Sequence, residues 1–153
     1  LRAGRNIAIL RTCSKIYGLA GLRIGYGVGP SWLVDAIDRI RRPFHVNRLA
    51  QIAAVAAFSD DEHIKMTLET NEAGKEYLYR AFAEMGLEYV PTETNFILVD
   101  VGQDSDRLYD ELLRRGVIVR PMAPWGYKTK LRVTIGTQRQ NERFIAALKQ
   151  VLA

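Results

Sequence analysis

One segment dominates the interpretation of this chain: Arg11-Thr12-Cys13-Ser14-Lys15-Ile16-Tyr17-Gly18-Leu19-Ala20-Gly21-Leu22-Arg23-Ile24-Gly25-Tyr26-Gly27. It follows the apolar run at 7–10, which is typical of a buried strand. Four glycines fall within the segment, and glycine lets the backbone adopt positive φ and approach a ligand closely. The pattern therefore predicts a strand followed by a tight, ligand-binding turn.

The polar residues of this turn suggest a specific chemistry. Lys15 lies among Ser14, Tyr17 and small residues, a setting that we expect to desolvate its amine and favour its use as a nucleophile. Arg23 offers a rigid fork of donors suited to a phosphate, and Thr12 and Ser14 add hydroxyl donors for the same anion. A carbonyl-reactive amine beside a phosphate site is what pyridoxal phosphate requires.

Each of these residues also has a purely structural interpretation. Lys15 would be an exposed turn lysine, and Arg23 would pair with an acidic residue. Thr12 and Ser14 would shape the turn through their hydroxyl groups, while Cys13 would pack beneath it.

Composition limits the other possibilities. The chain has 153 residues, of which 48% are hydrophobic and 25% are charged. This composition is typical of a globular protein, and the length is sufficient for a hydrophobic core. The net charge of +5 comes from scattered basic residues, so we expect a solvated surface and no nucleic-acid partner. The single cysteine fits a reducing cytoplasm, and no apolar run is long enough for a membrane span. His45 and His63 are not spaced as metal ligands are, so we expect no metal site.

Hydrophobic periodicity predicts an alternation of strands and helices. Proline after Gly29 begins a helix, Asn47 caps another, and Gly86 ends a long one. The expected strands lie at 6–11, 22–28, 87–90, 95–101, 117–120 and 131–135, and the expected helices at 31–42, 48–58, 61–85, 105–115 and 138–152. We place a domain boundary within the long helix, giving domains 1–76 and 77–153.

Several blocks of the chain, in order, resemble class I/II aminotransferases of the aspartate aminotransferase fold, and the likeness is greatest to histidinol-phosphate aminotransferases. The blocks are Ser14-Lys15 with Gly18-Leu19-Ala20-Gly21-Leu22-Arg23-Ile24-Gly25-Tyr26, Arg41-Arg42-Pro43-Phe44-His45-Val46-Asn47, Glu93-Thr94-Asn95-Phe96-Ile97-Leu98-Val99, Arg115-Gly116-Val117-Ile118-Val119-Arg120-Pro121-Met122 and Leu131-Arg132-Val133-Thr134-Ile135-Gly136-Thr137. The resemblance implies an α/β fold, the C-terminal part of a fold-type I pyridoxal-phosphate transferase. Residues 1–76 would end the large-domain sheet, and residues 77–153 would form a small α+β domain.

The resemblance also implies roles for individual residues. Lys15 would be the catalytic lysine that holds pyridoxal phosphate covalently, and Arg23, Ser14 and Thr12 would bind the cofactor phosphate. Arg132 lies within an apolar strand, where a buried charge needs a partner. By the same likeness Arg132 pairs with a substrate carboxylate or its equivalent. Arg120 would face a substrate phosphate or form a structural salt bridge, and Asn95 would lie on the substrate side or cap backbone groups.

The activity implied is transfer of an amino group between histidinol phosphate, or a similar phosphorylated amine or aromatic amino acid, and 2-oxoglutarate. The setting would be histidine biosynthesis in a cytoplasmic homodimer. Alternatives are a phosphothreonine-type decarboxylase, an inert fragment and a ligand-sensing aminotransferase-like domain. The family's acidic partner of the pyridinium nitrogen precedes the lysine, and none of the fourteen residues before Lys15 is acidic. We therefore expect a fragment that is catalytically poor by itself.

Overall fold

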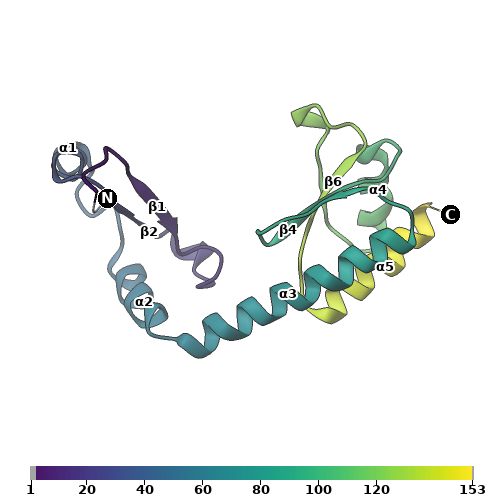
Figure 1. Ribbon diagram of the computed structural model, residues 1–153, viewed down its shortest axis with the longest axis horizontal. Coiled ribbons are helices and arrows are strands. Elements are labelled where there is room, and N and C mark those ends of the chain that lie inside the picture. Colours follow the sequence, from purple (N-terminus) through teal and green to yellow (C-terminus); the bar gives the residue numbers. More distant parts are fainter. Residues whose placement is uncertain (1–2, 153) are drawn as a thin grey trace. The chain divides into compact units, whose positions relative to one another are not determined.

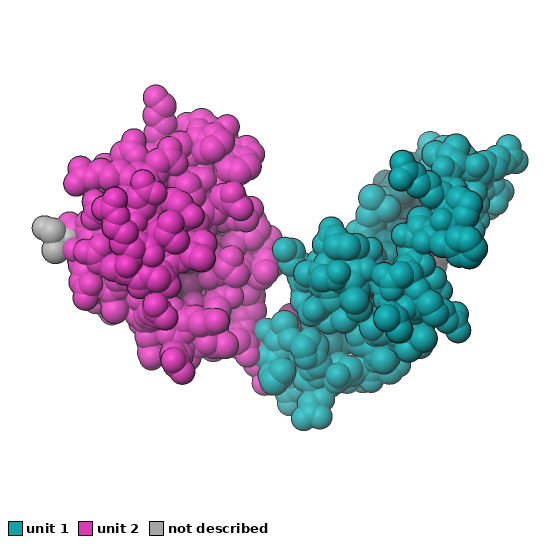
Figure 2. Space-filling model, turned by 180° about the vertical axis from the view of Figure 1, so that it is seen from behind, with its two compact units in different colours: residues 1–67 teal, residues 68–153 magenta. Residues whose placement is uncertain are grey.

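The computed structural model describes residues 3–152 of the chain. Its helices and strands follow one another in the order β1, η1, β2, α1, α2, α3, β3, β4, α4, β5, η2, β6, α5 (Figure 1). Two compact units share the chain, residues 1–67 and 68–153, and the division falls inside the long helix α3 (Figure 2). The predicted domain boundary at 76/77 stays a prediction.

The first unit contains a two-stranded antiparallel sheet. Strand β1, Ile9–Thr12, pairs with β2, Gly25–Val28, so that Arg11 lies opposite Tyr26 and Thr12 opposite Gly25. All eight strand residues are exposed, so the expectation of a buried strand at 7–10 is wrong for the chain as described, because no other layer covers these residues there. The expected strand at 22–28 is shorter, because Ala20–Leu22 forms the 3-10 turn η1 and Arg23 adopts a left-handed conformation.

Two helices follow the sheet. Helix α1, Ser31–Ile40, begins directly after Pro30, as the proline at the helix start predicts. Helix α2, Arg48–Phe58, is capped by Asn47, whose side-chain Oδ1 accepts a 2.8 Å hydrogen bond from the Ala50 amide. Small side chains let α2 pack closely, and Ala50 and Ala54 are buried.

Helix α3, Asp61–Glu84, leads into the second unit and ends as expected at Gly86, which has a φ of 68°. Its buried residues, Gly74, Leu78, Ala81 and Phe82, all belong to its C-terminal half. Leu68, in the N-terminal half of α3, is 55% exposed, because it precedes the part of the helix that packs against the core.

The second unit contains a four-stranded antiparallel sheet in the order β3-β4-β6-β5. The strands are β3, Tyr89–Val90, β4, Phe96–Asp100, β5, Arg120–Pro121, and β6, Lys130–Thr134. The expected strand at 117–120 is mostly absent, because the Val117 amide bonds to the Leu112 carbonyl at the end of the preceding helix. Strand pairing therefore begins only at Arg120.

Helices α4, Ser105–Arg114, and α5, Gln138–Leu152, complete this unit, and the short 3-10 turn η2, Ala123–Trp125, joins β5 to β6. Side chains from one face of the sheet and from α3, α4 and α5 form a single hydrophobic core. Leu108 and Leu112 point into the core, whereas Leu113 is 42% exposed, since it lies one residue, about 100°, around the helix from Leu112. Within residues 3–152, no helix combines the length and the apolar character that crossing a membrane requires.

Candidate functional site

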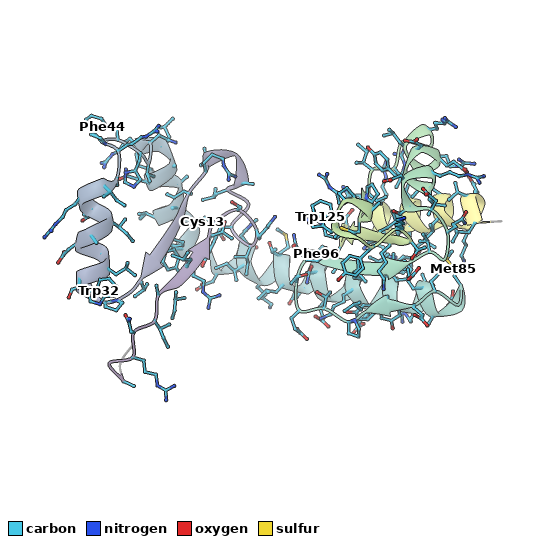
Figure 3. All side chains as sticks on the ribbon, turned by 90° about the horizontal axis from the view of Figure 1, so that it is seen from above. Cys13, Trp32, Phe44, Met85, Phe96 and Trp125 are labelled. Atoms are coloured by element: carbon cyan, nitrogen blue, oxygen red, sulfur yellow. The ribbon has the colours of Figure 1, made fainter. Side chains whose placement is uncertain are left out.

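The turn between β1 and β2 is held by its own backbone. The Cys13 amide donates to the Ile24 carbonyl at 3.1 Å, and the Leu19 amide donates to the Cys13 carbonyl at 3.0 Å. Cys13 is completely buried beneath the turn, as predicted (Figure 3). The Gly18 amide donates to the Lys15 carbonyl at 2.9 Å, and Gly18 has a φ of +66°, which favours glycine.

Lys15 is presented to solvent by this turn. Its side chain is exposed, and no ion pair or hydrogen bond of its amine is found within residues 3–152. The expectation that the amine is desolvated is therefore wrong for the chain as described, because the Lys15 side chain is exposed.

Arg23 lies at the other end of the turn in a strained conformation. Its φ of 53° and ψ of 49° are left-handed, and such a conformation costs a non-glycine residue about 1–3 kcal/mol. One guanidinium nitrogen, Nη1, donates to the Ala20 carbonyl at 2.8 Å, and no carboxylate pairs with Arg23 in the described part of the chain. Its remaining donors are available to an anion.

A shallow cleft of about 350 Å³ runs along the turn. It is lined by Leu10, Arg11, Thr12, Ser14, Arg23, Ile24 and Gly25. The structure thus brings together three of the predicted phosphate-binding residues, Thr12, Ser14 and Arg23, while Lys15 lies beside the lining and not in it. The lining contains two arginines and two hydroxyl side chains and no acidic residue, which is chemistry that suits a phosphate.

Two details explain the shape of this cleft. A Cβ at Gly25 would come within 2.5 Å of the Arg11 carbonyl oxygen, so only glycine lets β2 approach β1 here. The Ser14 amide donates to Thr12 Oγ1 at 3.0 Å. The Thr12 hydroxyl therefore shapes the turn, and its own hydrogen is still available as a donor.

The sequence analysis missed one residue beside this turn. Phe58, the last residue of α2, contacts the rings of both Tyr17 and Tyr26. Nothing in the sequence distinguishes Phe58 from an ordinary apolar residue at a helix end, because its partners come from a distant strand and turn.

The second unit brings two predicted substrate residues together. Arg132 on β6 lies directly opposite Arg120 on β5, and residues opposite each other in antiparallel strands project from the same face of the sheet. Arg132 is half-buried, not fully buried as expected, and its Cζ lies 5.2 Å from the centroid of the Phe96 ring. Figure 3 labels Phe96.

Neither arginine has a carboxylate partner in the part of the chain that the structure describes. No ion pair of Arg120 or Arg132 occurs within residues 3–152, and the alternative of a structural salt bridge for Arg120 finds no support there. Two like charges on directly opposite positions repel each other, so an anion between them would be stabilised. Asn95, just before β4, is half-buried, and its carbonyl accepts from the Ile135 amide at 2.9 Å.

A metal centre finds no support in the described residues. Between residues 3 and 152, no group of three or more histidine, cysteine, aspartate or glutamate side chains gathers at one point.

Comparison with known proteins decides the family. The family model described as aminotransferase class I and II matches residues 1–148. The chain belongs to this aminotransferase family. It is 57% identical, over its whole length, to histidinol-phosphate aminotransferase of Moorella thermoacetica, and 51% identical over 96% of its length to histidinol-phosphate aminotransferase 1 of Nitrosococcus oceani. It spans about 40% of the length of these relatives.

A solved structure supports the same assignment. The crystal structure of histidinol-phosphate aminotransferase from Sinorhizobium meliloti, in complex with pyridoxal-5'-phosphate, superposes with a TM-score of 0.86 at 32% identity. The superposition covers 96% of this chain and 41% of that one. The predicted α/β fold of this aminotransferase family is thereby confirmed.

Proposed function

We propose that this chain is the lysine-bearing part of a pyridoxal-phosphate-dependent aminotransferase. The observation that carries the proposal is the cleft beside Lys15, which presents Arg11, Arg23 and two hydroxyl side chains without any carboxylate. In this proposal Lys15 holds the cofactor covalently, and Arg23, Thr12 and Ser14 bind its phosphate. The family and the cofactor of the Sinorhizobium meliloti structure support the assignment.

The residues have distinct tasks in the reaction. When bound, pyridoxal phosphate supplies an electron sink for charge that develops on the substrate carbon. Phosphate contacts from Arg23 and from the Thr12 and Ser14 hydroxyls would hold the cofactor in place. Lys15 Nζ would take a proton from the substrate carbon and pass it on to the cofactor.

The substrate side is assigned to the second unit. Arg132 binds a carboxylate or an equivalent anionic group in bidentate fashion, and Arg120 binds a phosphate, each neutralising the repulsion between the two guanidinium groups. Asn95 adds a polar contact. The amino donor would be histidinol phosphate or a similar phosphorylated amine, which accords with the names of the two curated relatives. The acceptor would be a 2-oxo acid such as 2-oxoglutarate.

We also propose a wider setting, which the family supports. We assign the protein to histidine biosynthesis in the cytoplasm, acting as a homodimer on small molecules. Because the chain spans about 40% of its relatives, the acidic partner of the pyridinium nitrogen is assigned to the remaining part of such an enzyme. The two domains, 1–76 and 77–153, would then contribute the cofactor lysine and the substrate arginines respectively.

The proposal is tested by following both products. The full-length aminotransferase that contains this chain is incubated with pyridoxal phosphate, histidinol phosphate and 2-oxoglutarate, and glutamate is measured. Glutamate formation that is lost in Lys15→Ala and retained in Lys128→Ala supports transamination. Release of carbon dioxide from phosphothreonine without glutamate formation would indicate the decarboxylase instead, and a protein that binds the cofactor without either product would be a sensor or an inert fragment.

A further inference from the structure

The aromatic rings of Phe58, Tyr17 and Tyr26 connect helix α2 to the turn that carries Lys15 and to strand β2. Phe58 lies edge-on to Tyr17, with ring centroids 5.1 Å apart and an interplanar angle of 73°. It also lies edge-on to Tyr26, with centroids 5.6 Å apart and an angle of 79°. Both distances and angles fall in the favoured range for edge-to-face aromatic pairs.

The two tyrosines occupy informative positions. Tyr17 lies inside the hydrogen-bonded turn that runs from Lys15 to Gly18. Tyr26 lies on β2, three residues after Arg23 and opposite Arg11. A single ring of α2 therefore contacts the segment that presents the amine and the strand that follows the phosphate-binding arginine.

The contacts do more than bury apolar area. Phe58 is 44% exposed and Tyr26 is 45% exposed, so burial at this point is incomplete. The packing of α2 rests on Ala50 and Ala54, which are 0% and 4% exposed. Removing the Phe58 ring should therefore leave the helix in place and act mainly on the turn.

We propose that Phe58 is a positioning residue that fixes the turn, through Tyr17 and Tyr26, with the Lys15 amine at a constant offset from Arg23. This inference rests on the proposed function, because the offset matters only if one ligand engages both residues. Without the Phe58 ring, the segment from Cys13 to Ile24 gains conformational freedom, and binding pyridoxal phosphate has to remove it. Two aromatic contacts of ordinary strength predict cofactor binding that is about tenfold weaker.

The test compares Phe58→Ala, Phe58→Leu and Phe58→Tyr in the protein loaded with pyridoxal phosphate. Phe58→Leu retains apolar bulk but no ring, and Phe58→Tyr retains the ring. Leu49→Ala, at a 74% exposed position of the same helix, serves as the matched control. The readouts are the cofactor dissociation constant from visible absorbance and the hydrogen-exchange rates of the Gly18 and Leu19 amides, which close the turn. Circular dichroism checks that each variant is folded.

We expect about tenfold weaker cofactor binding and faster Gly18 and Leu19 exchange in both Phe58→Ala and Phe58→Leu. Phe58→Tyr and Leu49→Ala should remain within about twofold of the wild type, a difference below 1 kcal/mol. Recovery of binding and slow exchange in Phe58→Leu would overturn the inference, because bulk alone would then suffice. Wild-type protein that binds no pyridoxal phosphate would instead refute the proposed function, whereas unchanged binding and exchange in Phe58→Ala would refute only the role of Phe58.

Discussion

Asn141 offers the most quantitative test of how the second unit holds strand β6, which carries Arg132. Its side chain is 2% exposed. Its Oδ1 accepts from the Gly136 amide at 2.9 Å, and its Nδ2 donates to the Gly136 carbonyl at 3.0 Å. The two bonds connect helix α5 to Gly136, which follows strand β6. Each bond contributes about 1 kcal/mol, and the unpaired Gly136 groups add a desolvation cost, so Asn141→Ala should lose about 2–3 kcal/mol.

For a unit of this size, a loss of that magnitude lowers the melting temperature by about 10–20 °C. Urea unfolding followed by circular dichroism measures the free energy, and hydrogen exchange of β6 and α5 locates the effect. Asn141→Asp keeps the acceptor but sets a carboxylate against the Gly136 carbonyl, and it should be destabilised at pH 7. Arg139→Ala, at an exposed position of the same helix, should change stability by less than about 0.5 kcal/mol. A loss below about 0.5 kcal/mol in Asn141→Ala would refute the reasoning.

Three further predictions concern local features. Gly74→Ala should destabilise the second unit by about 1–2 kcal/mol in urea unfolding, because a Cβ would lie 2.8 Å from Asn141 Nδ2. The strain from this contact exceeds the helix-propensity gain of about 1 kcal/mol that alanine brings. A raised urea midpoint would contradict this prediction. The pKa of Asp100 lies below its ordinary value of 3.8, chiefly because its carboxylate accepts a hydrogen bond from the Gly102 amide. Thr129 and Lys130 lower the same pKa by smaller amounts. The stability that the ionised carboxylate contributes is present above pH 3.8 and is lost as the pH falls through the folded-state pKa of Asp100. In acid titrations, Asp100→Asn should therefore be less stable than the wild type at pH 7 but not at about pH 2. Asn47→Ala should cost about 1 kcal/mol of stability, with faster amide exchange in the first turn of α2, and unchanged exchange would count against the cap.

The sequence predicted most features that depend on neighbouring residues. The Asn47 cap, the end of α3 at Gly86 and the burial of Cys13 all follow from local chemistry, and each is confirmed. The position of Arg120 opposite Arg132 could be predicted only with knowledge of the register between β5 and β6. Periodicity does not fix register between two strands joined by a turn of irregular length.

Other features depend on contacts that no local pattern encodes. The exposure of Lys15 depends on which parts of the chain surround the turn, and the glycine-rich composition does not report that. Leu113 is as apolar as Leu108 and Leu112, yet it is 42% exposed, because those two leucines already fill the buried side of α4. Phe58 acquires its partners only when α2 packs beside the turn.

The central claim is that Lys15, and no other lysine, carries pyridoxal phosphate. The decisive measurement is to add pyridoxal phosphate, reduce with borohydride and map the modified peptide by mass spectrometry. The claim predicts one modification per chain on Lys15, suppressed by inorganic phosphate competing for Arg23 and absent in Lys15→Ala. Modification spread over the remaining lysines, or none at Lys15, would contradict it; those lysines are Lys65, Lys75, Lys128, Lys130 and Lys149.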